Sequence, residues 1–296
     1  MLESGLFRLM IFLPLPSEGA VILHPPAPGD DRAGRYRTVV LRALESLSAG
    51  DDRPKTLHRL RTHLRRLQAY LELVGEASNA RIIAKCVSRL SRLRTLHVFE
   101  RYLVSLEAPR SDLRLIRKRI RTRQAKLQSL DVYRTIERRV QRHAIPPTPG
   151  NQGWMRERLL DLRQANGQAL GELIAHAQAK PRRKRLHALR LKIKSIRYQE
   201  EWALGQQEER PDLVGWLKHA QSVLGEYEER TQFRKLADKI GLQSLPRIEK
   251  DWRAARKKAR VLPDHLADLA GTMAPRSLRL VGSDRIRQFA VAGRHG

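Results

Sequence analysis

From residue 35 onward, apolar residues recur at intervals of three and four, which is the spacing of helices that bury one face. Glycine and proline interrupt this pattern repeatedly, so we expect helices of about fifteen to thirty residues between the breaks. Aromatic residues make up only 5% of the chain, which argues against a sandwich or a barrel. The pattern therefore predicts an all-α protein in which Leu, Ile and Val fill the space between helices.

The beginning of the chain departs from the helical pattern. Residues 6–15 form a short apolar stretch, but Glu3 stands where a signal peptide would carry basic residues, and proline interrupts the stretch. Residues 24–34 are rich in proline and glycine and cannot sustain a helix. We therefore expect a mobile leader over residues 1–34. We also expect a C-terminal tail over residues 263–296, which could recruit other proteins.

Two compositional features limit the class of protein. No stretch approaches the roughly 18 consecutive apolar residues of a membrane-spanning helix, so we expect no membrane partner. The single cysteine, Cys86, excludes an internal disulfide framework and any cysteine-based zinc cluster. Both features favour a protein of the reducing cytoplasm.

The chain contains an internal repeat. Residues 57–67 read LHRLRTHLRRL, and residues 186–196 read LHALRLKIKSI, 129 positions later. In each copy the apolar positions follow the spacing by which helices pack in bundles, and a neighbouring stripe begins with histidine and continues with cations. These stripes consist of His58, Arg61 and Arg65 in the first copy and of His187, Arg190, Lys194 and Arg197 in the second. We expect two similar helical halves, residues 35–145 and 153–262, joined by a linker at 146–152.

Positive charge is concentrated on three segments. The formal net charge is +28, and residues 53–66, 110–126 and 180–197 together contribute 22 of it. A surface that serves only solubility would mix both signs, so this concentration indicates a binding surface for an anion. In the middle segment, Arg114, Arg117 and Arg121 lie beside the expected buried stripe.

The kind of cation indicates phosphate. The chain has 45 arginines and 14 lysines, and the planar guanidinium group grips phosphate oxygens with two parallel hydrogen bonds. Rows of cations that repeat with every helical turn, about 5.4 Å, can follow a linear polymer rather than enclose one small molecule. The sequence therefore predicts a polymeric phosphate ligand.

At this point the chain resembles a known family. The two segments that open with LHxLR are similar to the two signature helices of the CHAD family, named as a histidine-bearing α-helical domain. The segment LSRLRTLHV at 90–98 and a long basic helix expected at 111–142 are similar to other parts of that family. The resemblance covers roughly residues 35–262. This chain departs from the family pattern at Thr95, where Asp is usual, and at Glu228 and Glu229, where Asn and Asp are usual.

The resemblance implies two four-helix bundles related by an approximate twofold axis, with a basic central channel that binds inorganic polyphosphate. It also implies association with polyphosphate granules. We expect no cofactor. Carried over to this sequence, the ligand contacts fall on the two histidine-headed stripes and on Arg94. The complete set, with three residues added from the charge pattern, is His58, Arg61, Arg65, Arg94, Arg114, Arg117, Arg121, His187, Arg190, Lys194 and Arg197.

Three questions remain open from the residues. His58 and His187 are core histidines that bond a neighbouring carbonyl, packing residues near the helix N-terminus without a functional role, or ligand contacts. Nucleic acid is the competing partner, because basic helices bind its phosphates equally well, although the three basic segments lack interleaved aromatic residues. Catalysis is not expected, because the sequence has no catalytic or nucleotide-binding motif and its adjacent glutamates point to different sides of their helices. The sequence does not indicate an oligomeric state.

Overall fold

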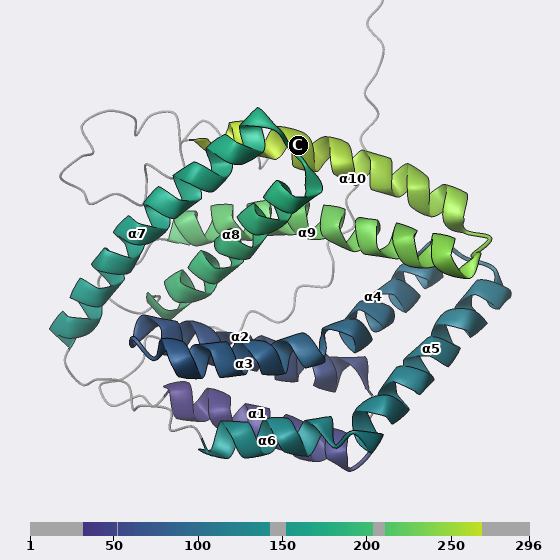
Figure 1. The fold of residues 1–296 in the computed structure, drawn as a ribbon, viewed down its shortest axis with the longest axis horizontal. Coiled ribbons are helices and arrows are strands. Elements are labelled where there is room, and N and C mark those ends of the chain that lie inside the picture. The colour runs from purple at the N-terminus through teal and green to yellow at the C-terminus, as the bar shows by residue number, and fades with distance from the viewer. Residues whose placement is uncertain (1–31, 52, 143–151, 204–210, 268–296) are drawn as a thin grey trace, which may run out of the picture.

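The computed structural model describes residues 32–51, 53–142, 152–203 and 211–267, and in these ranges every regular element is a helix (Figure 1). This confirms the all-α prediction. The expected leader, linker and tail lie largely outside the described residues. The helices are α1 (Arg32–Ser48), α2 (Pro54–Leu73), α3 (Ala77–Arg89), α4 (Ser91–Ser105), α5 (Arg110–Ser129), α6 (Val132–Arg142), α7 (Gln152–Ala179), α8 (Arg183–Ala203), α9 (Pro211–Ile240) and α10 (Leu245–His265).

The prediction of a single basic helix at 111–142 is wrong, because the chain forms two helices there. Helix α5 ends at Ser129 and α6 begins at Val132. Between them, Asp131 has a φ of +48°, in the left-handed region that ends a helix. The turn allows α5 to pack against α4 while α6 packs against α1. Because neither glycine nor proline marks this break, the pattern of residues does not predict it.

The apolar stripes of the internal repeat are buried in both copies. In α2, the leucines at positions 57, 60, 64 and 67 are at most 2% exposed, and in α8 the equivalent side chains at 186, 189, 193 and 196 are at most 1% exposed. Helices α1, α3 and α6 pack around the stripe of α2, and helices α7, α9 and α10 pack around the stripe of α8. The repeat therefore places two equivalent helices against two separate apolar cores.

The expected halves are not independent of each other, since the core of the first continues into the second. Phe233 of α9 and Ile248 of α10 belong to the apolar cluster that contains α2 and α4. The rings of Phe99 and Phe233 are stacked with their centroids 4.6 Å apart. The Asp112 carboxylate, buried at the start of α5, accepts hydrogen bonds from the backbone N–H and the hydroxyl of Ser244 at 2.9 and 2.7 Å. These contacts fix α4 and α5 to the ends of α9 and α10.

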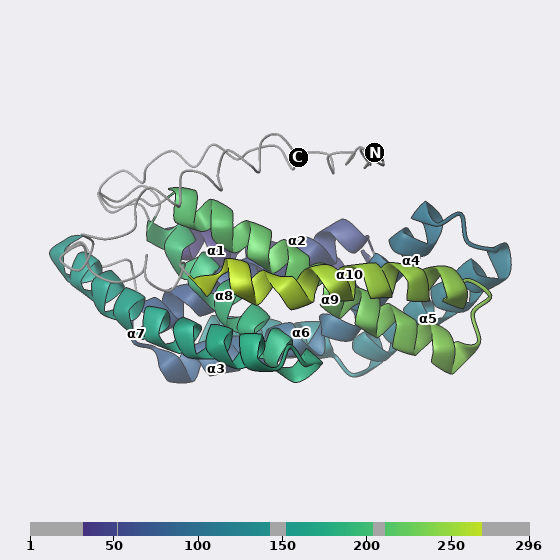
Figure 2. The ribbon, with the colours of Figure 1, turned by 90° about the horizontal axis from the view of Figure 1, so that it is seen from above.

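Four helices surround the middle of the molecule: α2, α4, α9 and α8 (Figure 1). Helix α2 packs against both α4 and α8, and α8 packs against α9. The circle closes where α4 meets α9 through the Phe99 and Phe233 rings. Seen from above, the helices form a slab that is broader than it is thick (Figure 2). This central ring of helices brings the two signature helices together. Along the described part of the chain, no helix combines the length and the apolar character needed to cross a bilayer.

Candidate anion-binding site

Helix α2 contributes two half-buried arginines, Arg61 and Arg65, one turn apart beside its buried leucine stripe. Arg61 donates hydrogen bonds of 2.9 Å to the carbonyl oxygen of Val87 and to the hydroxyl of Ser91, where α3 meets α4. These bonds restrict the side chain and orient it before any ligand arrives. An oriented guanidinium group loses less conformational entropy when it binds an anion.

Helix α8 contributes Arg190, Lys194 and Arg197, which lie on successive turns and are half-buried. The ring of Tyr198 supports two of them, with Arg197 Cζ at 4.3 Å and Lys194 Nζ at 5.9 Å from the ring centroid. Arg197 also donates a 2.9 Å hydrogen bond to Gln221 of α9 and pairs with Glu201. The cationic stripe of α8 is therefore held by aromatic and polar contacts of its own.

The cations of α2, α4 and α8 influence one another electrostatically. Burial, followed by the charges of Arg65 and Arg94, lowers the pKa of Arg61 to about 9. Burial likewise lowers the pKa of Arg65, and the charges of Arg190, Arg94 and Arg197 contribute to the shift. Side chains from opposite halves of the sequence therefore lie close enough to repel. We call this group the central cluster; it consists of Arg61, Arg65, Arg94, Arg190, Lys194 and Arg197.

Burial and this repulsion act together on Lys194. Burial lowers its pKa to about 6, and the charges of Arg65, Arg190, Arg61 and Arg197 act in the same direction. An isolated ammonium group among cations is costly, and release of its proton relieves the cost. The arginines keep their charge at neutral pH, so the free protein holds several cations around an uncharged amine.

Two carboxylates of α9 border the central cluster. Arg94 donates a 2.6 Å hydrogen bond to Glu229, and Arg183 donates a 2.7 Å hydrogen bond to Glu228. Burial tends to raise the pKa of Glu228, but hydrogen bonds from Arg183 and Gln232 outweigh it and lower the pKa. The glutamates at the positions that depart from the family pattern thus serve as internal anions for cations of α4 and α8. Thr95 of α4, at the third departure, donates a 3.3 Å hydrogen bond to Gln232 of α9.

Neither signature histidine packs in the core. His58 is exposed on α2. The side chain of His187 is 41% exposed, and its Nδ1 lies 3.5 Å from the Glu228 carboxylate. Both rings are therefore accessible, which excludes the interpretation of core histidines. Contact with a ligand stays a prediction for both.

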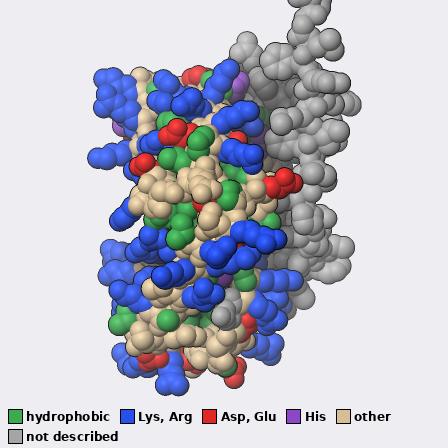
Figure 3. Space-filling view, turned by 90° about the vertical axis from the view of Figure 1, so that its right-hand side faces the viewer, with side chains coloured by type: hydrophobic (Ala, Val, Ile, Leu, Met, Phe, Trp, Pro, Cys, Tyr) green, Lys and Arg blue, Asp and Glu red, His purple; other side chains and the backbone are tan. Residues whose placement is uncertain are grey.

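The three arginines added from the charge pattern lie on α5 rather than among the cations of α2 and α8. Arg114, Arg117 and Arg121 are exposed, and Arg117 donates a 2.6 Å hydrogen bond to Glu100 of α4. Lys and Arg side chains are spread over this end of the molecule, with acidic side chains among them (Figure 3). The structure thus separates the α5 row from the six residues of the central cluster.

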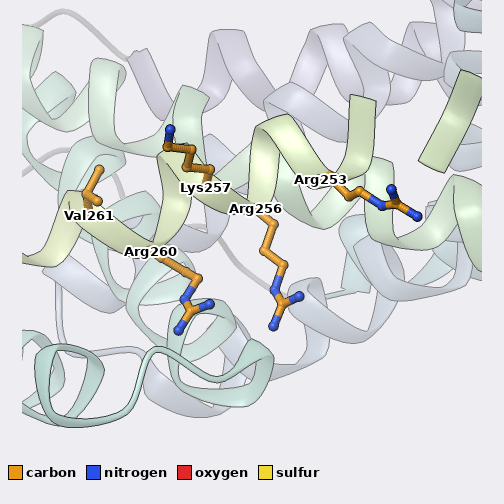
Figure 4. A pocket seen from close by; sticks show the side chains of 5 residues that line it. All are labelled: Arg253, Arg256, Lys257, Arg260 and Val261. Atoms are coloured by element: carbon orange, nitrogen blue, oxygen red, sulfur yellow. The ribbon is translucent and has the colours of Figure 1, made fainter. Parts of the chain in front are cut away.

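Sequence reasoning missed a fourth basic surface on α10. Residues 253–260 hold five cations and no acid, a signal that the sequence itself displays. Arg253, Arg256, Lys257 and Arg260 line a shallow depression of about 340 Å³, in which Arg256 and Arg260 extend in the same direction (Figure 4). Helix α10 packs on α9 and α7. The exposed cations of α10 form a surface of similar charge, with which binding by the central cluster can be compared.

The chemistry of the central cluster is that of hydrogen-bond donors. Across the described ranges, no group of three or more His, Cys, Asp or Glu side chains is arranged to hold a metal ion. Five of the six side chains in the central cluster are guanidinium groups, which donate hydrogen bonds to oxygen and accept none.

Comparison with known proteins agrees with this architecture. The family model described as CHAD domain matches residues 34–238. The crystal structure of the CHAD domain from the plant Ricinus communis is similar in fold, with a TM-score of 0.52 and 18% sequence identity, over 86% of this chain and 88% of the plant chain. A search of curated proteins gave no match. At this identity the structural likeness supports the fold and not a particular ligand.

Proposed function

Because the chain belongs to the CHAD domain family, we propose that it binds inorganic polyphosphate, without catalysis, through the cations of the central ring of helices. The observation that carries this proposal is that α2 and α8 pack against each other and bring two cationic stripes together, with Arg61 and Arg65 on α2 and Arg190 and Lys194 on α8. Polyphosphate is a linear polymer with about one negative charge per phosphate, so it can compensate several of these cations at once.

The arrangement favours a chain over a compact anion. The cations stand on successive turns of two helices, so the contacts repeat about every 5.4 Å along each helix. A linear polyanion that runs between α2 and α8 meets guanidinium groups from both sides, and Arg94 adds a cation from α4. On this proposal, α2, α4, α8 and α9 line a basic channel, as the family resemblance implies.

Non-catalytic binding is supported by the ion pairs that the nearby carboxylates form. Glu228, Glu229 and Glu201 each pair with an arginine. A paired carboxylate is stabilised in its charged form and makes a weak general base. Phosphoryl transfer also requires acidic side chains that hold metal ions beside the phosphates, and the carboxylates that border the central cluster are already paired with arginines.

The test is competition binding at one fixed salt concentration. Fluorescence anisotropy with labelled long-chain polyphosphate compares three competitors: unlabelled polyphosphate, duplex DNA and single-stranded RNA. We expect polyphosphate to compete most strongly, and a salt series to show a steep loss of affinity because binding releases counterions. Stronger competition by either nucleic acid would replace this proposal with nucleic-acid binding.

Matched variants locate the site. Arg61→Gln/Arg65→Gln/Arg190→Gln removes three charges from the central cluster, and Arg253→Gln/Arg256→Gln/Arg260→Gln removes three from α10. We expect a loss of affinity on the order of 100-fold or more in the first variant and less than about fivefold in the second, because buried charges are screened less than exposed ones. The α5 variant Arg114→Gln/Arg117→Gln/Arg121→Gln measures the contribution of that row. Equal losses in all three variants would show that overall charge, and not the central cluster, binds the polymer.

Association with polyphosphate granules in the cytoplasm is the cellular part of the proposal. A fluorescent fusion of the full chain is expected to gather on granules in cells that make polyphosphate. It is expected to be diffuse in cells that lack polyphosphate and when the fusion carries the triple substitution in the central cluster. Granule localisation of that variant would assign the targeting to another part of the chain.

A further inference from the structure

Lys194 differs from the other lysines of the described chain in its surroundings. It projects from the middle of α8, is half-buried, and lies over the ring of Tyr198. The charged groups that act on it are Arg190 and Arg197 of its own helix and Arg61 and Arg65 of α2. Within the described residues, no carboxylate pairs with its amino group. By contrast, Glu72 acts on Lys192, two positions earlier on α8.

An amine inside a cluster of guanidinium groups combines two properties that are seldom found together. The arginines attract a phosphate group and hold its oxygens, and they disfavour a positive charge on the amine beside it. A small molecule that carries both a phosphate group and an electrophilic carbon would therefore be bound and presented to a nucleophile. Acyl phosphates, the mixed anhydrides of a carboxylic acid and phosphoric acid, have this structure.

We propose that Lys194 is a covalent modification site, at which acyl phosphates acylate the amine after the surrounding arginines have bound their phosphate group. The proposal rests on the proposed function in one respect, since the same arginines serve as the anion site. It adds a second class of ligand, a small activated metabolite, and a chemical step that polyphosphate binding does not involve.

The step balances without any further reactant. The lone pair of Lys194 Nζ attacks the carbonyl carbon of the acyl phosphate, the bond from that carbon to the phosphate oxygen breaks, and inorganic phosphate leaves with the bonding electrons. The amine loses one proton to solvent, and an amide remains. The guanidinium groups stabilise the negative charge that develops on the leaving phosphate.

The protonation state of Lys194 supports this chemistry. Burial and the neighbouring arginines lower its pKa to about 6, so the amine is mostly unprotonated at pH 7.5. An ordinary exposed lysine, with a pKa near 10.4, is unprotonated in only about one molecule in a thousand at that pH. An acyl phosphate brings fewer negative charges than polyphosphate, so it raises the pKa of the amine less and leaves a larger fraction of the amine unprotonated.

Acylation would change the polyphosphate site in a defined direction. It adds bulk to the centre of the cluster and removes the group that can take up a proton when an anion binds. We therefore expect acylated protein to bind polyphosphate less tightly. Occupancy by polyphosphate, in turn, should protect Lys194 from acylation, because both ligands use the same arginines.

The experiment treats the full chain with acetyl phosphate at pH 7.5 and follows each lysine by peptide mass spectrometry. Lys192 on the same helix and the exposed Lys184 are internal comparators. We expect Lys194 to be acetylated at least about 30-fold faster than Lys184. The unprotonated fraction of Lys194 exceeds that of Lys184 by a larger factor, but a less basic amine is also a weaker nucleophile. Excess polyphosphate is expected to suppress labelling at Lys194 and to leave Lys184 unchanged. Acetylation of Lys194 at the same rate as Lys184, or no protection by polyphosphate, would overturn the proposal.

Two controls separate this proposal from the proposed function. A neutral acylating reagent without a phosphate group, N-hydroxysuccinimidyl acetate, should show a smaller preference for Lys194 than acetyl phosphate does, since the arginines cannot recruit it. Polyphosphate affinity is measured separately on the unmodified protein. Tight binding together with unselective acetylation would leave polyphosphate binding intact and remove only the modification site.

Discussion

Arg94 of α4 donates a 2.6 Å hydrogen bond to Glu229 of α9, across 135 residues of sequence. The two side chains are 30% and 25% exposed, so water screens the pair only in part. The bond joins the two halves at the border of the central cluster and occupies one of its cations with an internal anion. Binding of an external polyanion at Arg94 therefore competes with Glu229.

The first prediction follows from this competition. Glu229→Gln removes the internal anion and leaves Arg94 available, so affinity for polyphosphate should rise about three- to tenfold, equivalent to roughly 1 kcal/mol. The free energy of unfolding should change by less than about 1 kcal/mol, because a partly exposed ion pair contributes little. Fluorescence anisotropy and thermal unfolding measure the two quantities. As a matched control, Glu100→Gln breaks the exposed pair with Arg117 and should leave affinity unchanged. Weaker binding by Glu229→Gln would mean that Glu229 helps to form the site.

The second prediction concerns proton uptake. The free protein has Lys194 with a pKa of about 6, lowered by burial and by Arg65, Arg190, Arg61 and Arg197. Phosphate groups beside the amine raise this pKa, so from about pH 6 upward the complex binds more protons than the free protein. Affinity should therefore fall as pH rises from 6 to 8 and should level off below pH 6. Calorimetry in buffers of different ionisation enthalpy should detect an uptake of up to one proton at pH 7.5.

Lys194→Arg is the control for proton uptake, because arginine stays charged throughout this range. The variant should bind without the uptake assigned to Lys194. Any dependence on pH that persists near 6.5 in this variant would report the signature histidines, His58 and His187. Unchanged uptake in Lys194→Arg would assign the proton to another group.

The third prediction concerns the stability of the free protein. The folded-state pKa of Lys194 lies below its unfolded value, so the unfolded chain binds more protons between about pH 6 and 10. Lys194 therefore destabilises the fold most at low pH, and this penalty declines as pH rises through the interval. Lys194→Met should raise the free energy of unfolding at pH 6 by an amount on the order of 2 kcal/mol, and by less at pH 9. Urea unfolding at the two pH values measures the difference, and a loss of stability at pH 6 would contradict the assigned cause.

The fourth prediction concerns a buried ion pair away from the central cluster. Arg163 of α7 donates hydrogen bonds of 3.0 and 2.7 Å to the two carboxylate oxygens of Glu200 on α8, and both side chains are at most 3% exposed. Glu200→Gln should lower the free energy of unfolding by about 3–5 kcal/mol, because it leaves a buried guanidinium charge without its counterion. The double variant Arg163→Met/Glu200→Leu should lose less than the single variant. Chemical denaturation measures both, and a loss below about 1 kcal/mol in Glu200→Gln would show that water reaches the pair.

The sequence by itself determined the helical class, the repeat and the identity of the two cationic stripes. These features are local, because a period of three and four residues fixes which side of a helix is buried and which side carries charge. The buried stripe that begins at Leu57 and its copy that begins at Leu186 both occur as predicted. Position along one helix was enough to place Arg61 beside Arg65 and Arg190 beside Lys194.

Only the tertiary structure decided how these local features combine. The break at Asp131 depends on where α6 can pack, and the pairing of Arg94 with Glu229 depends on α4 meeting α9. The α5 arginines show the same limit, since their pattern resembles that of α2 although they lie exposed and apart from the central cluster. A charge pattern gives the direction of a side chain about its own helix axis, whereas the distance between charges on different helices is set by core packing. The pKa of Lys194 is lowered first by burial in this packing and then by nearby charges, two of which, Arg61 and Arg65, lie more than 120 residues earlier in the chain.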